Sequence, residues 1–162
     1  MRVLIILCGI FCVGYAQWQQ SRMTKCCADK QINVDSKCRH TCKYTFTKER
    51  AICNAETCAT EMQKVVFCAN DGKSNSRCCA KSGVPPKCVR FCANKVPPNN
   101  DLISQEYFEC LDYMQTILDC AKEGVKKGKP QYTKKKPKFD KTPLNKGKLT
   151  MLRAVTQQYC TG

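Results

Sequence analysis

Few of the groups that build catalytic sites occur in this sequence. It has one histidine, His40, and no Gly-x-Ser-x-Gly segment of the kind that exposes a serine nucleophile. Its 13 acidic residues are scattered and form no pair in apolar surroundings. We therefore predict that the protein is not an enzyme and needs no cofactor, and that His40 lies on the surface of a helix.

Long hydrophobic runs are also missing, and so is any Asn-x-Ser/Thr acceptor for N-glycosylation. The longest apolar run covers residues 3–13, whereas a membrane-spanning helix needs about 20 apolar residues. The run follows the positive charge of Arg2 and precedes small residues at Gly14 and Ala16, which is the pattern of a secretory signal peptide. We expect residues 1–16 to be removed, leaving a secreted, extracellular protein without a transmembrane segment.

Cysteine, in contrast, is abundant. Of the 16 cysteines, two lie in the signal segment, and thirteen of the others lie between Cys26 and Cys120. Zinc sites favour Cys-x2-Cys steps with histidine partners, and the sequence has neither such a step nor a second histidine. In an oxidising compartment such thiols pair and persist as disulfides. The predicted disulfide scaffold uses Cys26, Cys27, Cys38, Cys42, Cys53, Cys58, Cys68, Cys78, Cys79, Cys88, Cys92, Cys110, Cys120 and Cys160.

Positive charge is concentrated toward the C-terminal end. Residues 121–162 hold twelve of the 28 Lys and Arg residues and two acids, and so carry +10 of the formal net charge of +15. From residue 125 onward the chain is rich in lysine and proline and poor in large aliphatic residues. Such a stretch buries too little surface to offset its chain entropy. We predict that residues 125–162, the basic tail, are largely disordered, although the more apolar end near Cys160 is able to dock back on the core.

The basic tail is also the main candidate for binding. Outside cells a flexible polycation attracts sulfated polysaccharides, anionic lipid head groups or acidic proteins through salt-sensitive attraction. The expected partner is an unknown extracellular protein or an anionic polysaccharide, and secretion argues against nucleic acid. A solvated tail without a partner is an equal alternative, and cleavage at the Lys-Lys pairs is a third. The candidate anion-binding residues are Lys126, Lys127, Lys129, Lys134, Lys135, Lys136, Lys138, Lys141, Lys146 and Lys148.

Before the tail, the apolar residues recur at helical spacing. The clearest helix starts after Ser104 as N-cap and ends at Gly124, with apolar residues three and four positions apart. A second stripe runs from Ala55 to Ala69, and an Asn-Asp-Gly turn stops it. The pattern predicts one all-α, disulfide-rich domain of about five to six short helices over residues 20–124. Candidate starts for the shorter helices lie near Ser21, Asp35 or Ser36, Thr47, Arg77 and Pro86.

The order of the cysteines is similar to that of a known family. It consists of the doublets Cys26-Cys27 and Cys78-Cys79, the steps Cys38-x3-Cys42 and Cys88-x3-Cys92, and the stretch Cys-Ala-Asn-Asp-Gly at Cys68. In this order the chain resembles the nematode DB module, a cysteine-rich extracellular domain family with twelve conserved cysteines thought to form six disulfides. The resemblance covers residues 24–124. It implies the compartment and the disulfide-rich fold, and it implies no particular activity, because none is well established for the family.

Two cysteines, Cys53 and Cys160, fall outside the family's pattern. If the family's twelve cysteines pair among themselves, these two are left over together. Our hypothesis is that they form a seventh bridge that pins the end of the tail to the core of a monomer. The alternative is that Cys160 links two chains.

The cysteine doublets leave a second function open. Doublets also occur in helical lipid carriers, whose disulfides frame an apolar tunnel, although a doublet also serves simply to send bridges in two directions across a small core. The sequence therefore favours a secreted, non-catalytic binding or structural module. A carrier of an apolar ligand, or a membrane-active secreted protein, is the alternative.

Overall fold

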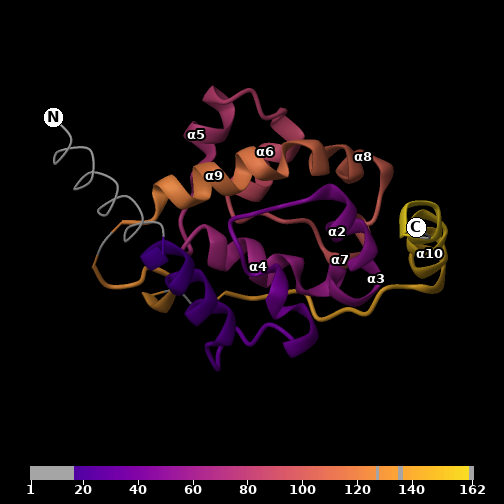
Figure 1. Ribbon diagram of the computed structural model, residues 1–162, viewed down its shortest axis with the longest axis horizontal. Coiled ribbons are helices and arrows are strands. Elements are labelled where there is room, and N and C mark those ends of the chain that lie inside the picture. The colour runs from indigo at the N-terminus through magenta and orange to yellow at the C-terminus, as the bar shows by residue number, and fades with distance from the viewer. Residues whose placement is uncertain (1–16, 127, 135–136, 161–162) are drawn as a thin grey trace, which may run out of the picture.

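The computed structural model describes residues 17–126, 128–134 and 137–160 (Figure 1). The regular elements in these residues are all helices, so the all-α prediction is confirmed. None of the described helices is long and apolar enough to cross a membrane. The predicted signal peptide lies outside the described residues. A first helix covers residues 17–28, and the elements after it, with η for a 3-10 helix, are η1 (Ser36–Thr41), α2 (Lys48–Cys53), α3 (Ala55–Cys58), η2 (Ala59–Glu61), α4 (Met62–Ala69), α5 (Ser76–Lys81), α6 (Pro86–Cys92), α7 (Asn99–Leu102), α8 (Gln105–Phe108), η3 (Glu109–Tyr113), α9 (Met114–Gly124), η4 (Tyr132–Lys134) and α10 (Lys146–Cys160).

Local chemistry accounts for several helix ends. The Asp35 carboxylate accepts a hydrogen bond from the Lys37 N–H at 2.8 Å and caps η1. Pro86 occupies the first helical position of α6, where its missing N–H costs nothing. After α4 the backbone turns left-handed at Asp71 (φ 50°) and Gly72 (φ 68°), as the Asn-Asp-Gly turn predicted.

Two stretches that we expected to be single helices are each divided. The stretch beginning at Ala55 forms α3, η2 and α4, and the stretch after Ser104 forms α8, η3 and α9. One division falls at Cys58 and the other contains Cys110, and both are disulfide cysteines. A disulfide holds its two Cα atoms at a set separation, here 5.5 and 5.4 Å, so we attribute the local tightening of the helix to the bridge.

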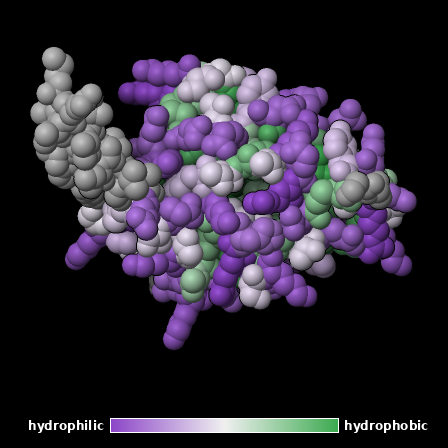
Figure 2. All heavy atoms as spheres, viewed as in Figure 1, coloured by the Kyte–Doolittle hydropathy of each residue, from purple (hydrophilic) through white to green (hydrophobic). Residues whose placement is uncertain are grey.

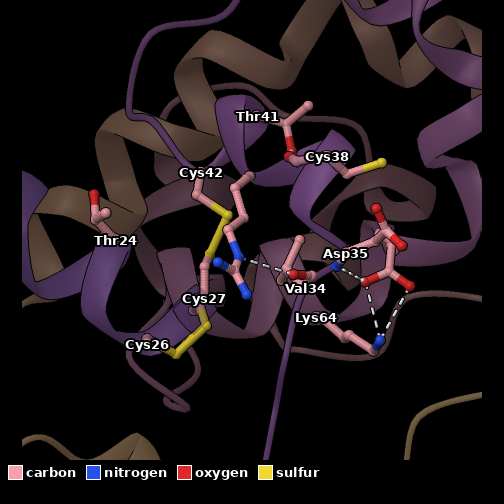
Figure 3. The surroundings of a disulfide bond; sticks show 12 residues. Thr24, Cys26, Cys27, Val34, Asp35, Cys38, Thr41, Cys42 and Lys64 are labelled. Carbon is pink, nitrogen blue, oxygen red and sulfur yellow. Dashed lines mark hydrogen bonds and ion pairs between the residues drawn. A yellow bond between two sulfur atoms is a disulfide. The ribbon is translucent and has the colours of Figure 1, made fainter. Parts of the chain in front are cut away.

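Seven disulfides cross-link the described residues. Figure 3 shows the first doublet, in which Cys27 is bonded to Cys42. Cys26 is bonded to Cys68 instead. All the paired cysteines of the first helix and of α4, α6 and α9 are buried. The seven pairs are Cys26–Cys68, Cys27–Cys42, Cys38–Cys58, Cys53–Cys160, Cys78–Cys120, Cys79–Cys92 and Cys88–Cys110.

Six of these bridges repeat one pattern twice, in residues 26–68 (the first half) and residues 78–120 (the second half). In each half, the first cysteine of the doublet pairs with the last cysteine, 42 residues further on. The second cysteine of the doublet pairs with the second cysteine of the Cys-x3-Cys step. The first cysteine of that step pairs with Cys58 in the first half and with Cys110 in the second; these are the next cysteines after the step once Cys53, which bonds to Cys160, is set aside. The core is therefore built from two units with the same disulfide topology.

The basic tail does not follow our expectation of disorder. Where it is described, it crosses the outside of the core and ends in α10, a helix of 15 residues that packs against α2 and α3 (Figure 1). In Figure 1 it is the orange-to-yellow trace that passes below α4 and α7. The tail is held by polar contacts to its backbone, by a few buried apolar side chains such as Tyr132 and Leu152, and by the Cys53–Cys160 bridge, none of which its overall composition reveals.

The first of these contacts comes from Arg22, which is only 7 % exposed. Its guanidinium donates to the carbonyl oxygens of Lys126 (2.5 Å) and Gly128 (2.6 Å). It lies 5.0 Å from the centre of the Trp18 ring and 3.8 Å from the Asp71 carboxylate. One buried arginine thus fastens the start of the tail to the first helix.

Asp71 and Gly72 form the next contact. The Asp71 carboxylate accepts hydrogen bonds from the backbone N–H groups of Gln131 (3.1 Å) and Tyr132 (3.4 Å). Gly72 lies so close to the tail that an added Cβ atom would be 3.1 Å from the Tyr132 Cα atom. The turn that ends α4 therefore also receives the tail.

Further along the tail, Asp140 is hydrogen-bonded to Asn99 of the core. The Asn99 N–H donates to the Asp140 carboxylate (2.8 Å), and the Asn99 side chain donates to the Thr142 carbonyl (2.9 Å). Hydrogen bonds from Thr142, and then from Asn99, hold the pKa of Asp140 below its usual range. The Gln63 side chain accepts from the Asp140 N–H at 2.8 Å, which ties this part of the tail to α4.

Candidate functional site

An apolar pocket of about 130 Å³ lies between the two halves. The first half lines it through the end of η1, the segment after it, and α2, α3, η2 and α4, with Ile52, Ala59 and Val66 among the buried residues. The second half lines it through α6, α9 and the elements between them, with Phe91 and Met114 among the buried residues. The pocket is thus a product of the way the two halves pack together.

The two halves contribute different chemistry to this pocket. Every lining residue from the second half is apolar or aromatic. The charged lining residues, the threonines and Asn54 all belong to the first half. The exposed lining residues all fall within residues 40–50, so the pocket meets solvent along that segment. Three bases, His40, Lys43 and Arg50, lie in this mouth, and no acidic residue lines the pocket.

The mouth includes an extended segment that is held by two glutamines. The Gln20 side chain donates to the Cys42 carbonyl (2.8 Å) and accepts from the Tyr44 N–H (3.2 Å). From α9, the Gln115 side chain donates to the Tyr44 carbonyl (3.1 Å) and accepts from the Phe46 N–H (2.9 Å). These bonds satisfy backbone groups that would otherwise need a neighbouring strand. The mouth is therefore positioned by the framework before any ligand arrives.

Tyr44 anchors the same segment from within the core. It is 5 % exposed, and its hydroxyl donates to the Ala69 carbonyl at 2.9 Å. Burial, and secondly the charge of Asp71, raise the pKa of Tyr44 well above its ordinary value. The hydroxyl consequently stays protonated and keeps its hydrogen bond at all physiological pH values.

Apolar groups are gathered inside the molecule rather than on its outer surface. Among the described residues, Tyr159 is the one large hydrophobic side chain that is exposed, at 52 %. On the face drawn in Figure 2, hydrophobic residues form small separate areas between hydrophilic ones. The interior pocket is therefore the place where an apolar ligand would find a matching surface.

A second cavity of about 280 Å³ lies where the tail crosses the core. The Phe139 ring packs edge-on against Phe67 beside it, with the ring centres 5.7 Å apart. Its lining also includes Gln63, Asn94 and Asp140, so polar groups surround much of it. This cavity suits an apolar ligand less well than the pocket between the halves.

The predicted anion-binding lysines that the structure describes are distributed over several segments, from the end of the core at Lys126 through η4 to α10. Six of them are exposed, and none of these six takes part in an ion pair with a described residue: Lys126, Lys129, Lys134, Lys138, Lys141 and Lys146. Lys148 is half-buried, and its ammonium donates to the Ile103 carbonyl at 2.6 Å. Lys127, Lys135 and Lys136 lie outside the described residues.

His40 is exposed, and its Nδ1 atom lies 2.7 Å from the Lys37 carbonyl oxygen. In the described part of the chain, no three His, Cys, Asp or Glu side chains are grouped so as to hold a metal ion. Sequence reasoning did not place His40 at the pocket. No local pattern marks it, because the pocket forms only when the two halves meet.

Comparison with known proteins gives one family and one relative. The family is the DB module, whose profile matches residues 26–121. The relative is the "Ig-like and fibronectin type-III domain-containing protein 2" of Caenorhabditis elegans, which is 31 % identical over 104 residues. The matched region is 62 % of this chain but only 6 % of the relative. No solved structure matches the chain.

Proposed function

This chain belongs to the DB module family, and we propose that it is a secreted, non-catalytic binding module that holds an apolar ligand between its two halves. The observation that carries this proposal is the pocket, whose walls are aliphatic and aromatic on the side of the second half. Small-molecule sites in proteins have this character: a mostly apolar concave lining with a few polar groups at defined places.

Several features support an extracellular setting. Seven disulfides are typical of proteins that fold in an oxidising compartment. The name of the C. elegans relative associates the matched segment with fibronectin type-III domains, which are common in cell-surface proteins. The apolar run within residues 1–16 has the order of a signal peptide.

The lining of the pocket also favours binding over catalysis. It contains no carboxylate and no serine, and its one cysteine, Cys58, is bonded to Cys38. An acid–base pair or an activated nucleophile would require such groups close together. The hydrogen bond of the His40 ring is to the Lys37 carbonyl, which is outside the lining of the pocket.

Titration with hexan-1-ol tests the proposal, because this neutral molecule suits the size of the pocket. We expect it to shift the amide NMR signals of lining residues such as Ala59, Val66 and Met114 in the full, oxidised protein. Ala51→Trp, which enlarges a half-buried lining residue of α2, is expected to weaken this binding strongly. The matched control is Ala80→Trp, on the exposed surface of α5 and away from the pocket. Equal effects of the two variants, or no shifts in the parent protein, would contradict the proposal.

A second candidate function is polyanion binding by the tail. Its support is the set of six exposed tail lysines without ion-pair partners among the described residues. Replacing these six with glutamine is expected to lower the salt concentration that elutes the protein from heparin, because fewer counterions are then exchanged. The control replaces six lysines of the core by glutamine: Lys25, Lys30, Lys37, Lys73, Lys81 and Lys95. Since both variants lose the same charge, equal shifts would show that the tail has no special role.

A further inference from the structure

The charge at the mouth of the pocket has one sign. Lys43 and Arg50 are both exposed lining residues, and no aspartate or glutamate lines the pocket. Neither side chain forms an ion pair or a hydrogen bond with any described residue. In contrast, Lys48, which lies in α2 with Arg50, forms an ion pair with Asp112 of the second half at 2.6 Å. Two positive charges thus stand available at the entrance of an apolar site.

The apolar space behind these charges is small. Its volume is about 130 Å³. An apolar protein cavity of about 150 Å³ holds a benzene molecule, so this space takes about six carbon atoms. A longer single chain would extend from the pocket into the mouth, and a lipid with two long chains would not be enclosed.

From this combination we propose that the ligand is a single-chain amphiphile of about six to ten carbon atoms with an anionic head group. The chain fills the pocket between the halves, and the head group lies at the mouth against Lys43 and Arg50. This inference rests on the proposed function and adds the charge and size of the ligand. Attraction of a carboxylate to two exposed cations is modest, because solvent and salt screen it, but a cationic head group would be repelled.

Three probes with the same eight-carbon chain test the head group: octanoate, octan-1-ol and octyltrimethylammonium. By calorimetry at low ionic strength we expect octanoate to bind about fivefold to tenfold more tightly than octan-1-ol, as two exposed charge contacts allow. Octyltrimethylammonium is expected to bind most weakly. Added salt should reduce the advantage of octanoate and leave the affinity for octan-1-ol unchanged.

Variants at the mouth separate charge from the pocket itself. Lys43→Ala with Arg50→Ala is expected to remove the advantage of octanoate over octan-1-ol. The matched control is Arg77→Ala with Lys81→Ala, which removes an exposed arginine and lysine from α5. Lys43→Glu should reverse the preference toward octyltrimethylammonium. Both mouth residues are exposed, so these variants are expected to fold.

The outcomes distinguish this inference from the proposed function. If octanoate and octan-1-ol bind equally well, or if the control pair has the same effect as the mouth pair, the anionic head group is wrong while an apolar ligand stands. If affinity keeps rising by the same factor for each methylene added from hexanoate to tetradecanoate, the size limit is wrong. If none of the probes binds, the proposed function fails together with the inference.

Discussion

The two halves of the core use the same disulfide topology for different purposes. The first half carries the polar mouth of the pocket and the additional cysteine Cys53, and the turn that follows it contacts the tail through Asp71. The second half supplies an apolar wall and Asn99, which holds the tail further along. Because the two halves share their bridges but differ in these side chains, we infer that the disulfides within each half maintain the backbone framework. The side chains at the contact between the halves are then left to form a site.

The largest effect is expected when one bridge is removed from each half in turn. Cys38→Ala with Cys58→Ala should lower the free energy of unfolding by about 3 kcal/mol, because the unfolded chain regains freedom. The equivalent variant of the second half is Cys88→Ala with Cys110→Ala. The bridge that it removes closes a loop of 22 residues rather than 20, so we expect a similar loss of stability. Urea unfolding of the oxidised proteins, followed by circular dichroism, measures both. A large inequality between the two losses would show that the halves are not energetically equivalent.

A somewhat smaller effect is expected for Arg22→Met, which removes a charge and keeps an apolar stem. The change leaves the buried Asp71 carboxylate and two tail carbonyls without their arginine partner. We expect a loss of about 2–3 kcal/mol in the free energy of unfolding. Amide hydrogen exchange should also become faster in residues 128–134. Arg77→Met, at an exposed position, is the control, and unchanged exchange in the tail would contradict the anchoring role of Arg22.

The bridge between Cys53 and Cys160 should matter less for global stability. Cys53 is exposed, and Leu152 is the buried residue of α10. Chain entropy alone would give this loop of 107 residues a larger effect than the shorter loops, but without the bridge α10 can also detach in the folded state, so both states gain freedom. We therefore expect Cys53→Ser with Cys160→Ser to cost about 1 kcal/mol or less and to speed amide exchange in α10 but not in α9. Preserved protection throughout α10 would show that Leu152 and the Arg153–Glu56 ion pair, at 2.7 Å, hold the helix unaided.

The smallest effect concerns alkaline pH. Tyr44 has a folded-state pKa raised above the ordinary value of 10.0. Above about pH 10 the unfolded state therefore releases this proton while the folded state keeps it, so stability falls as the pH rises through that range. Tyr44→Phe should make the unfolding free energy less dependent on pH between about 9 and 11. Tyr132 in the tail also has a raised pKa, mainly through burial, and Tyr132→Phe provides the comparison. No change of slope for Tyr44→Phe would mean that the hydroxyl ionises in the folded state.

Much of the core could be predicted from local patterns. The cap at Asp35, the proline at the start of α6 and the turn after α4 each act through neighbouring residues, and each occurs where expected. The four-residue helix α7 was not expected, because its stretch has little apolar periodicity. The pocket also escaped prediction, since the residues that line it look like ordinary apolar helix faces until the two halves are packed together.

By itself, the sequence determined the class of molecule: helical spacing set the secondary structure, and the number of cysteines set the need for disulfides. The pairing order within the halves depended on tertiary structure, because the spacing of cysteines allows many connectivities. The order of the tail was also a tertiary outcome. The composition of the tail predicts disorder, but the buried guanidinium of Arg22 and the carboxylate of Asp71 bind its backbone. These two residues belong to the core, so the composition of the tail does not include them. Local interactions can be read along a chain, whereas a pocket and a docked tail exist only where distant segments meet.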